Sequence, residues 1–376
     1  MKRNKIFKDF ISNEKSAGLI LIFCTAISLV LANCLISQQY IHLWHTTVLS
    51  KSIEFWINDG LMTIFFLFVG LEIKREIFVG ELSDIKKATL PVIAAIGGML
   101  IPALIHFIFN KGTATQIGFG IPMATDIAFS LAILSLLGNR VPNSLKTFLI
   151  ALAIMDDLGA IIVIALFYAN SFSTLYFGFA MLLLAIMLIL NRFKVYRTWA
   201  YLSIGMLMWY FMYKSGIHAT ITGVLIAFVI PFDKSVQNTA LNKLQQKLNL
   251  PVAYIILPLF ALANTAIPIP FSILNNLSSP NSYGIIFGLL IGKPLGIFLF
   301  SVFGVLIGIC AIPENLKKYH LLFVGLLAGM GFTMSIFITV LAYTDPVIIT
   351  SSKIAIMVGS AAAGALGYIG LRLTLK

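Results

Sequence analysis

The sequence predicts an all-α polytopic membrane protein with about twelve transmembrane helices, and three observations support this prediction. Hydrophobic residues make up 59% of the 376 residues and charged residues only 11%. The mean hydropathy is +0.98, and one globular core of this size could not bury so many apolar side chains. Apolar stretches of about 20 residues, the length that crosses a bilayer as a helix, follow one another along the chain. We therefore expect a single transmembrane domain over residues 1–376, embedded in a lipid bilayer.

Charged and polar residues separate the apolar stretches and place the spans in chain order. The seventh and eighth stretches are short and share one connection, so about eleven spans are an alternative. The longest connections, 37–56, 231–249 and 269–282, are predicted to be loops too short to bury a core. The predicted spans cover 17–36, 57–79, 90–109, 116–137, 145–169, 172–190, 198–213, 216–230, 250–268, 283–309, 320–342 and 350–373.

Three local features bear on this assignment of spans: the basic leader, Asp59 and the cysteines. A basic leader without a small-residue cleavage site precedes the first span, so we interpret that span as an uncleaved helix. Asp59 opens the second span, where a carboxylate interacts favourably with the helix dipole. The odd and scattered Cys24, Cys34 and Cys310 predict neither a disulfide framework nor a zinc site, and no cofactor is expected.

The distribution of Lys and Arg predicts the orientation, because cytoplasmic loops hold the excess of these residues. If the amino terminus is cytoplasmic, most of the 26 basic residues fall on that side, and both termini face the cytoplasm. This bias also explains the net charge of +12. The positive charge is scattered over short loops, so we expect no nucleic-acid partner. The lysines on the opposite side are Lys51, Lys111, Lys214 and Lys353.

Three acidic residues lie well inside apolar spans, where charge is costly. Asp126, Asp156 and Asp157 are these residues, and Lys293 is the matching basic one. An acid at a helix centre costs about 2.5–3.5 kcal/mol on insertion scales, so such residues indicate an ion pathway or binding site. One carboxylate could simply neutralise Lys293. That alternative does not explain why a second carboxylate lies directly beside the first in the Asp156–Asp157 pair.

The adjacent pair suits exchange of a cation for protons. Neighbouring helix residues point about 100° apart, so both carboxylates can line one cavity. Buried, closely spaced carboxyl groups bind protons more tightly than exposed ones, and hard cations prefer carboxylate and carbonyl oxygens. Protons and a hard cation can therefore compete for this pair. We expect the cation to bind at Asp156 and Asp157.

Two spans carry residues that interrupt a helix. The fourth span has Pro122 just before Thr125 and Asp126, and the eleventh has a glycine-rich segment, 325–333. Interrupted spans at corresponding places in two halves indicate a transporter site. The predicted topology makes the two halves, about 90–169 and 283–373, inverted repeats.

Other classes of membrane protein were weighed against this interpretation. An intramembrane aspartyl protease needs two aspartates on different helices, and Asp126 with Asp156 could imitate that arrangement. Its Gly-x-Gly-Asp context is missing, however. A cation channel would need a ring-forming filter segment, and none is evident. A proton-coupled importer of an organic solute stays open.

Several segments together resemble the NhaA family of bacterial sodium/proton antiporters. The resemblance extends over essentially the whole chain, in order. It implies a multi-pass protein of the bacterial inner membrane in which the two discontinuous helices, spans 4 and 11, cross. The segments are FVGLEIKRE (68–76), ATDIAFS (124–130), AIMDDLGA (153–160), LPLFALAN (257–264), IGKPLG (291–296) and GMGFTMSI (329–336).

The resemblance also implies a role for each site residue. Asp157 would be the principal sodium and proton carboxylate, and Asp156 would pair with Lys293 and join the exchange. Asp126, with Thr125 and Lys293, would balance the partial charges where the broken helices cross. The implied activity is electrogenic export of Na⁺, or Li⁺, in exchange for about two protons by alternating access. The role that the resemblance implies is pH and sodium homeostasis. Whether the protein forms a homodimer is left open.

Glu72 and His218 are candidates for a pH response. Glu72 would belong to the family's cytoplasmic funnel, while a hydrogen-bonded interfacial histidine is the alternative for His218. For Lys74, Arg75 and Glu76 the alternative is a solvated helix end with local ion pairs. The predicted loop at 241–247 contains no acids, although the family's pattern places acids there.

Overall fold

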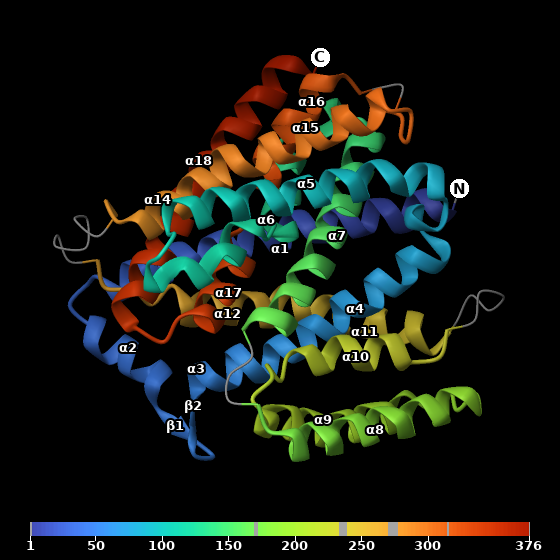
Figure 1. The fold of residues 1–376 in the computed structure, drawn as a ribbon, viewed down its shortest axis with the longest axis vertical. Helices are drawn as coiled ribbons and strands as arrows, with labels where there is room; N and C mark the ends of the chain where they lie inside the picture. Colours follow the sequence, from blue (N-terminus) through green and yellow to red (C-terminus); the bar gives the residue numbers. More distant parts are fainter. Residues whose placement is uncertain (1, 169–171, 233–238, 270–276, 314–315, 376) are drawn as a thin grey trace. The chain divides into compact units, whose positions relative to one another are not determined.

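The computed structural model describes residues 2–168, 172–232, 239–269, 277–313 and 316–375, and helices dominate it (Figure 1). Seven of its helices are long and apolar enough to cross a membrane, or up to 10 if each of three bent pairs is one span. The prediction of an all-α polytopic protein is therefore confirmed. The count of about twelve spans stays a prediction.

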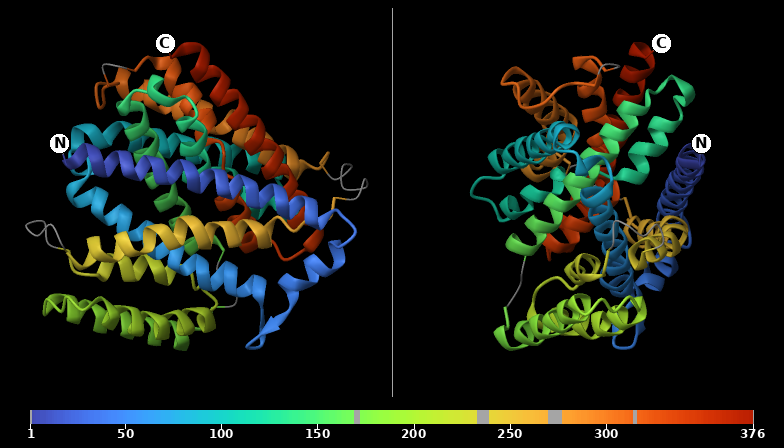
Figure 2. Two further views of the ribbon diagram at one scale, coloured as in Figure 1. Left: turned by 180° about the vertical axis from the view of Figure 1, so that it is seen from behind. Right: turned by 90° about the vertical axis from the view of Figure 1, so that its right-hand side faces the viewer.

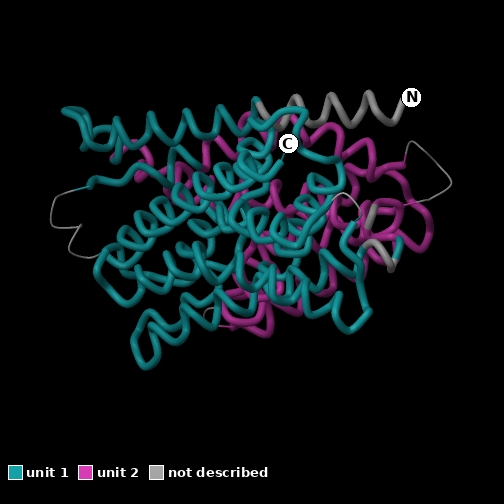
Figure 3. The backbone as a smooth tube through the Cα atoms, turned by 90° about the horizontal axis from the view of Figure 1, so that it is seen from above, with its two compact units in different colours: residues 1–41, 84–160, 261–376 teal, residues 42–83, 161–260 magenta. Residues whose placement is uncertain are grey.

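The helices form two compact units, which Figure 3 colours separately. Unit 1 comprises Met1–Ile41, Asp84–Ala160 and Ala261–Lys376, and unit 2 comprises His42–Ser83 and Ile161–Phe260. Helices α2 (Ser37–His45), α7 (Asn143–Phe167) and α12 (Leu257–Asn264) run from one unit into the other. The division of the chain into inverted repeats stays a prediction.

Unit 1 contains most residues of both predicted repeats. In Figures 1 and 2, α14 and α15 run beside α5, and these helices are in contact. Besides its parts of α2, α7 and α12, unit 1 contains α1 (Lys2–Ala32), α5 (Ile85–Phe109), the 3₁₀ element η3 (Ala114–Met123), α6 (Ile127–Ser135), η4 (Gly138–Arg140), α14 (Pro280–Phe287), η6 (Gly288–Gly292), α15 (Lys293–Leu306), α16 (Lys318–Ala328), α17 (Phe332–Ala342) and α18 (Pro346–Thr374).

Unit 2 contains a pair of neighbouring helices, α8 and α9, and a closely packed pair, α4 and α10 (Figure 1). Its elements are β1 (Thr47–Val48), β2 (Lys51–Ser52), α3 (Ile53–Phe55), η1 (Trp56–Leu61), α4 (Met62–Val79), η2 (Glu81–Ser83), α8 (Thr174–Arg192), α9 (Thr198–Ser215), α10 (Ile221–Val229), α11 (Ala240–Pro251) and η5 (Val252–Ile256).

Glycines allow α5 and α15 to pack backbone against backbone. A Cβ on Gly97 would overlap the carbonyl oxygen of Gly296, and a Cβ on Gly296 would overlap that of Gly97. Small residues permit this close approach between membrane helices. Lys293 lies one turn before Gly296, so the contact holds the amino-terminal end of α15 firmly against α5.

Both predicted interruptions are present. Element η3 and α6 bend by 41° at a break that follows Pro122, and α16 and α17 bend by 52° at a break that contains Gly329 and Gly331. The backbone N–H of Asp126 donates to the carbonyl of Met330 (2.7 Å), so the two breaks lie against each other. A proline without an amide hydrogen, and glycines without side chains, explain why the helices stop at these points.

Two segments predicted to be loops contain regular structure, and those predictions were wrong. Residues 37–56 hold α2, which bends 115° from α1, and the antiparallel strands β1 and β2. Residues 231–249 contain the start of α11, which the Thr239 hydroxyl caps by accepting from the Asn242 N–H (3.2 Å). The segment is polar, so a search for apolar stretches misses it.

Helix α10 is shorter than the predicted span 216–230, whereas α9 covers the whole of the predicted span 198–213. Gly216 ends α9 with a φ of 84°, a left-handed conformation that glycine adopts without strain. Helix α10 has only 9 residues, too few to cross a bilayer alone. Neither helix is among the seven candidate spans.

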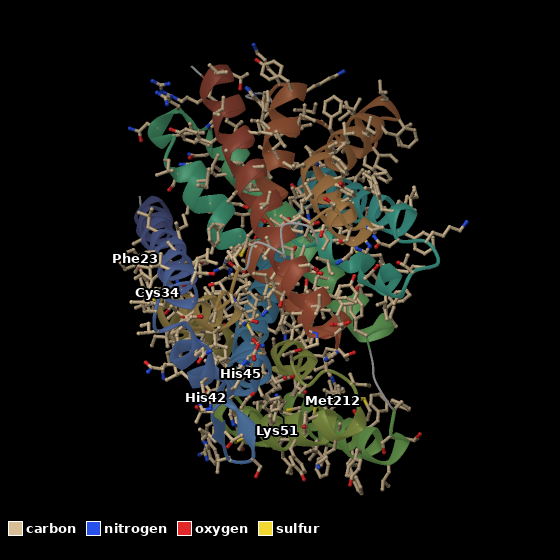
Figure 4. The ribbon with its side chains drawn as sticks, turned by 90° about the vertical axis from the view of Figure 1, so that its left-hand side faces the viewer. Phe23, Cys34, His42, His45, Lys51 and Met212 are labelled. Carbon is tan, nitrogen blue, oxygen red and sulfur yellow. The ribbon has the colours of Figure 1, made fainter. Side chains whose placement is uncertain are left out.

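The three cysteines are free thiols. Cys34, which lies between α1 and α2, is exposed, as is Phe23 of α1, and Figure 4 labels both. Cys24 and Cys310 are half-buried.

Candidate ion-binding site

The structure gathers the predicted site residues in unit 1. Asp156 and Asp157 lie on α7, Thr125 and Asp126 in the break between η3 and α6, and Lys293 at the start of α15. Thr125, Asp156 and Lys293 have no exposed surface, and Asp157 and Asp126 are 1% and 2% exposed. Burying these polar and charged groups is costly. Each therefore needs a hydrogen-bond partner or an opposite charge, supplied by the other groups or by a bound ion.

Asp126 caps two helices at once. Its Oδ1 accepts from the N–H of Phe129 (3.0 Å) at the start of α6. Its Oδ2 accepts from the N–H (3.0 Å) and the hydroxyl (2.5 Å) of Thr333 at the start of α17. A carboxylate is favourable at the positive end of a helix dipole, and here one carboxylate serves two such ends.

Lys293 pairs with Asp156 and with a helix end. Its Nζ lies 2.7 Å from Asp156 Oδ2 and also donates to the carbonyl of Met123, the last residue of η3. A cation there faces the negative end of that element. Asp157 also lies close enough to Lys293 for their charges to interact.

Thr125 joins the acidic pair to the second break. Its hydroxyl lies 2.7 Å from Asp156 Oδ2 and 3.0 Å from the carbonyl of Ala328. A hydroxyl has one hydrogen, so it donates to only one of these oxygens at a time. The Thr125 hydroxyl therefore connects Asp156 of the acidic pair with the carbonyl at the end of α16.

Asp156 keeps one carboxylate oxygen without a hydrogen-bond donor among the described residues. Its Oδ2 faces both Lys293 and Thr125, whereas Oδ1 is buried with no partner. A buried acceptor of this kind marks a place for a proton or a cation. Among the described residues no group of three or more His, Cys, Asp and Glu could hold a metal ion. A cation here would therefore need hydroxyl or carbonyl oxygens besides the two aspartates.

The candidates for a pH response, Glu72 and His218, belong to unit 2, whereas the other predicted site residues belong to unit 1. Glu72 is buried, and its Oε1 lies 3.9 Å from Arg75 Nη2. His218 Nε2 lies 2.7 Å from the carbonyl of Tyr168, an arrangement that matches the hydrogen-bonded alternative. Their part in a pH response stays a prediction.

Lys74 is buried, although the alternative interpretation of the sequence placed it at a solvated helix end. It is 6% exposed, and its Nζ donates to the carbonyls of Phe228 (2.7 Å) and Ile230 (2.6 Å) at the end of α10. The buried ammonium replaces the amide donors that the last turn of a helix lacks. For Lys74 that alternative is therefore wrong.

Sequence reasoning missed the hydroxyl groups that join the two breaks. Thr333 contacts Asp126, while Ser130 donates to the carbonyl of Leu327 and Ser335 to that of Ile121. Each hydroxyl residue follows closely after a break, and that position is a usable signal. Their partners, however, are about 200 residues away along the chain, and only the folded structure identifies them.

Comparison with known proteins identifies the family. The sequence model described as "Na+/H+ antiporter 1" matches residues 8–371. The chain belongs to this Na⁺/H⁺ antiporter family. The inferred resemblance is thereby confirmed, and the chain belongs with secondary transporters and is not an enzyme.

Similar proteins span the same length. "Na(+)/H(+) antiporter NhaA 1" of Flavobacterium johnsoniae is 57% identical, covering 100% of this chain and 98% of the relative. The NhaA antiporters of Flavobacterium psychrophilum and Cytophaga hutchinsonii are each 54% identical, covering 100% of this chain and 98% and 97% of the relatives. With this family membership, the protease, channel and importer alternatives are set aside.

Proposed function

We propose that this protein exports Na⁺, and Li⁺, from the bacterial cytoplasm in exchange for protons, and so contributes to pH and sodium homeostasis. The observation that carries the proposal is the buried Asp156–Asp157 pair. Lys293 and Thr125 contact Asp156 Oδ2, and no donor from the described part of the chain reaches Asp156 Oδ1. The pair lies beside two opposed helix breaks. Carboxylate, hydroxyl and freed carbonyl oxygens are the ligands that a hard cation requires.

Sodium and protons compete for the same oxygens in the proposed cycle. Sodium binds at Asp156 and Asp157, with Asp157 as the principal carboxylate. When sodium leaves, protons take its place, because bare buried carboxylates are costly. Lys293 stays beside Asp156 and compensates its charge whenever that carboxylate is deprotonated.

The proposed exchange moves charge. If two protons enter for each sodium ion that leaves, one net charge crosses the membrane in every cycle, and the potential contributes about 2.3 kcal/mol per 100 mV. The transport is therefore electrogenic, and the membrane potential drives sodium out. We further propose alternating access of the site to each side of the membrane, and a cytoplasmic location for both termini.

Everted membrane vesicles from a host without other sodium/proton antiporters test this function. The vesicles are energised to form a proton gradient, which a pH dye follows while Na⁺ is added. We expect Na⁺ to dissipate the gradient with the parent protein and not with Asp157→Asn. Asp345→Asn is the matched control, because Asp345 is an exposed helix cap far from the site in sequence. A parent protein that never responds to Na⁺ contradicts the proposed function.

A further inference from the structure

Two buried serines occupy matching positions in the two bent spans. Ser130 is the fourth residue of α6, and Ser335 is the fourth residue of α17. Neither side chain has any exposed surface. Each helix is the second half of its span, and each begins directly after a break.

Each serine donates to the first half of the other span. Ser130 Oγ donates to the carbonyl of Leu327 (2.8 Å), one residue before the end of α16. Ser335 Oγ donates to the carbonyl of Ile121 (2.7 Å), two residues before the end of η3. Carbonyls in the last turn of a helix have no amide partner further along it. The Leu327 carbonyl also accepts from the N–H of Met330 (3.1 Å), so the serine occupies its second lone pair.

The two bonds are therefore reciprocal, and the cation-site residues lie between them. Thr125 contacts the carbonyl of Ala328, which directly follows Leu327. The Asp126 carboxylate accepts from Thr333, two residues before Ser335. A shift of either break would move the Thr125 hydroxyl relative to Asp156. Binding groups must be held within about 0.5 Å of their working geometry, and hydrogen bonds from neighbouring residues provide that precision.

We propose that Ser130 and Ser335 are paired positioning residues for cation binding. Each serine fixes the end of the opposite broken span, and together they set the separation of the two breaks that present Thr125 to Asp156. This proposal rests on the proposed function, because its effect is on the binding of the transported cation. A hydroxyl that positions ligands changes the cation concentration needed for transport, whereas one that only aids folding changes the amount of active protein.

The test compares Ser130→Ala and Ser335→Ala with Ser301→Ala in everted vesicles. Ser301 is a suitable control because it lies in α15, has no exposed surface and its hydroxyl has no hydrogen-bond partner among the described residues. We expect Ser130→Ala and Ser335→Ala each to raise the apparent KM for Na⁺ about threefold to tenfold, as loss of one hydrogen bond predicts. The maximal response per amount of protein should stay at the parent level, and Ser301→Ala should match the parent.

A variant that does not reach the membrane is replaced by Ser130→Cys or Ser335→Cys. Cysteine is close to serine in size and is a weak donor, so the KM should still rise. Unchanged KM values, or a lower maximal response alone, would overturn the proposal. A KM shift in only one of the two variants would overturn the pairing. A parent protein without any sodium response would instead reject the proposed function, so the two failures are distinguishable.

Discussion

Lys293 Nζ lies 2.7 Å from Asp156 Oδ2, and neither side chain has any exposed surface. The same ammonium donates to the carbonyl of Met123. One cation thereby links α7, α15 and the end of η3. A buried ion pair of this kind is maintained only if both partners are present, because either charge alone is strongly unfavourable out of water.

Lys293→Met should destabilise the protein. It leaves the Asp156 carboxylate buried opposite an apolar side chain, and loss of one partner of a buried pair costs about 3–5 kcal/mol. The double variant Asp156→Asn with Lys293→Met removes both charges and should recover much of this loss. Thermal unfolding of the purified proteins in detergent at alkaline pH checks both expectations. A double variant that unfolds below Lys293→Met would contradict the pairing.

Asp126→Ala should be more harmful than Asp126→Asn. The alanine variant removes both acceptors that serve Phe129 and Thr333, whereas asparagine keeps one acceptor oxygen and loses the other together with the charge. A lost helix cap costs about 0.5–2 kcal/mol, and two helices are capped here. The unfolding temperatures of the two variants show which substitution destabilises the protein more. Equal losses would contradict the expectation, because the oxygen that asparagine retains would then contribute nothing to capping.

Gly97→Ala should reduce the amount of folded protein in the membrane. The added Cβ meets the backbone oxygen of Gly296, which cannot move aside as a flexible side chain can. Overpacking of this kind costs about 1–3 kcal/mol. Gly178→Ala in α8 is the control, because a Cβ there meets nothing within 4 Å. Fluorescence-detected size-exclusion chromatography measures both, and normal behaviour of Gly97→Ala would show that α5 and α15 pack differently.

Lys74→Met should destabilise unit 2. The substitution removes the donor to the carbonyls of Phe228 and Ile230 at the end of α10, and each buried acceptor left unsatisfied costs about 1–3 kcal/mol. Lys111→Met changes an exposed lysine and should leave stability unaltered. Hydrogen exchange followed by mass spectrometry should show faster exchange in the last turn of α10 in Lys74→Met alone. Unchanged exchange there would refute the capping role of Lys74.

The membrane class and the breaks could be predicted from the sequence because their causes are local. Hydropathy selects the apolar stretches, Pro122 removes an amide donor, and Gly329 and Gly331 weaken a helix. The acidic pair is equally plain, since charge inside an apolar span is costly wherever the partner lies. These observations sufficed to name Asp126, Asp156, Asp157 and Lys293.

Other features depend on residues that only folding brings together. The carbonyl partners of Lys74 are more than 150 residues away, so its burial could not be inferred from its neighbours in sequence. Helix α11 is different, because Thr239 and the spacing of Leu241, Leu244 and Leu248 are signals of an amphipathic helix. A search for apolar spans alone does not detect these signals.

The proposed competition between sodium and protons at Asp156 and Asp157 can be measured directly by calorimetry on the purified protein. Sodium is titrated in buffers that differ in their heat of ionisation, and the dependence on buffer gives the protons released for each ion bound. The parent protein should release protons, up to about two for each sodium ion, and Asp157→Asn should bind sodium weakly and release fewer. Sodium binding by the parent without any proton release would contradict exchange at this carboxylate pair.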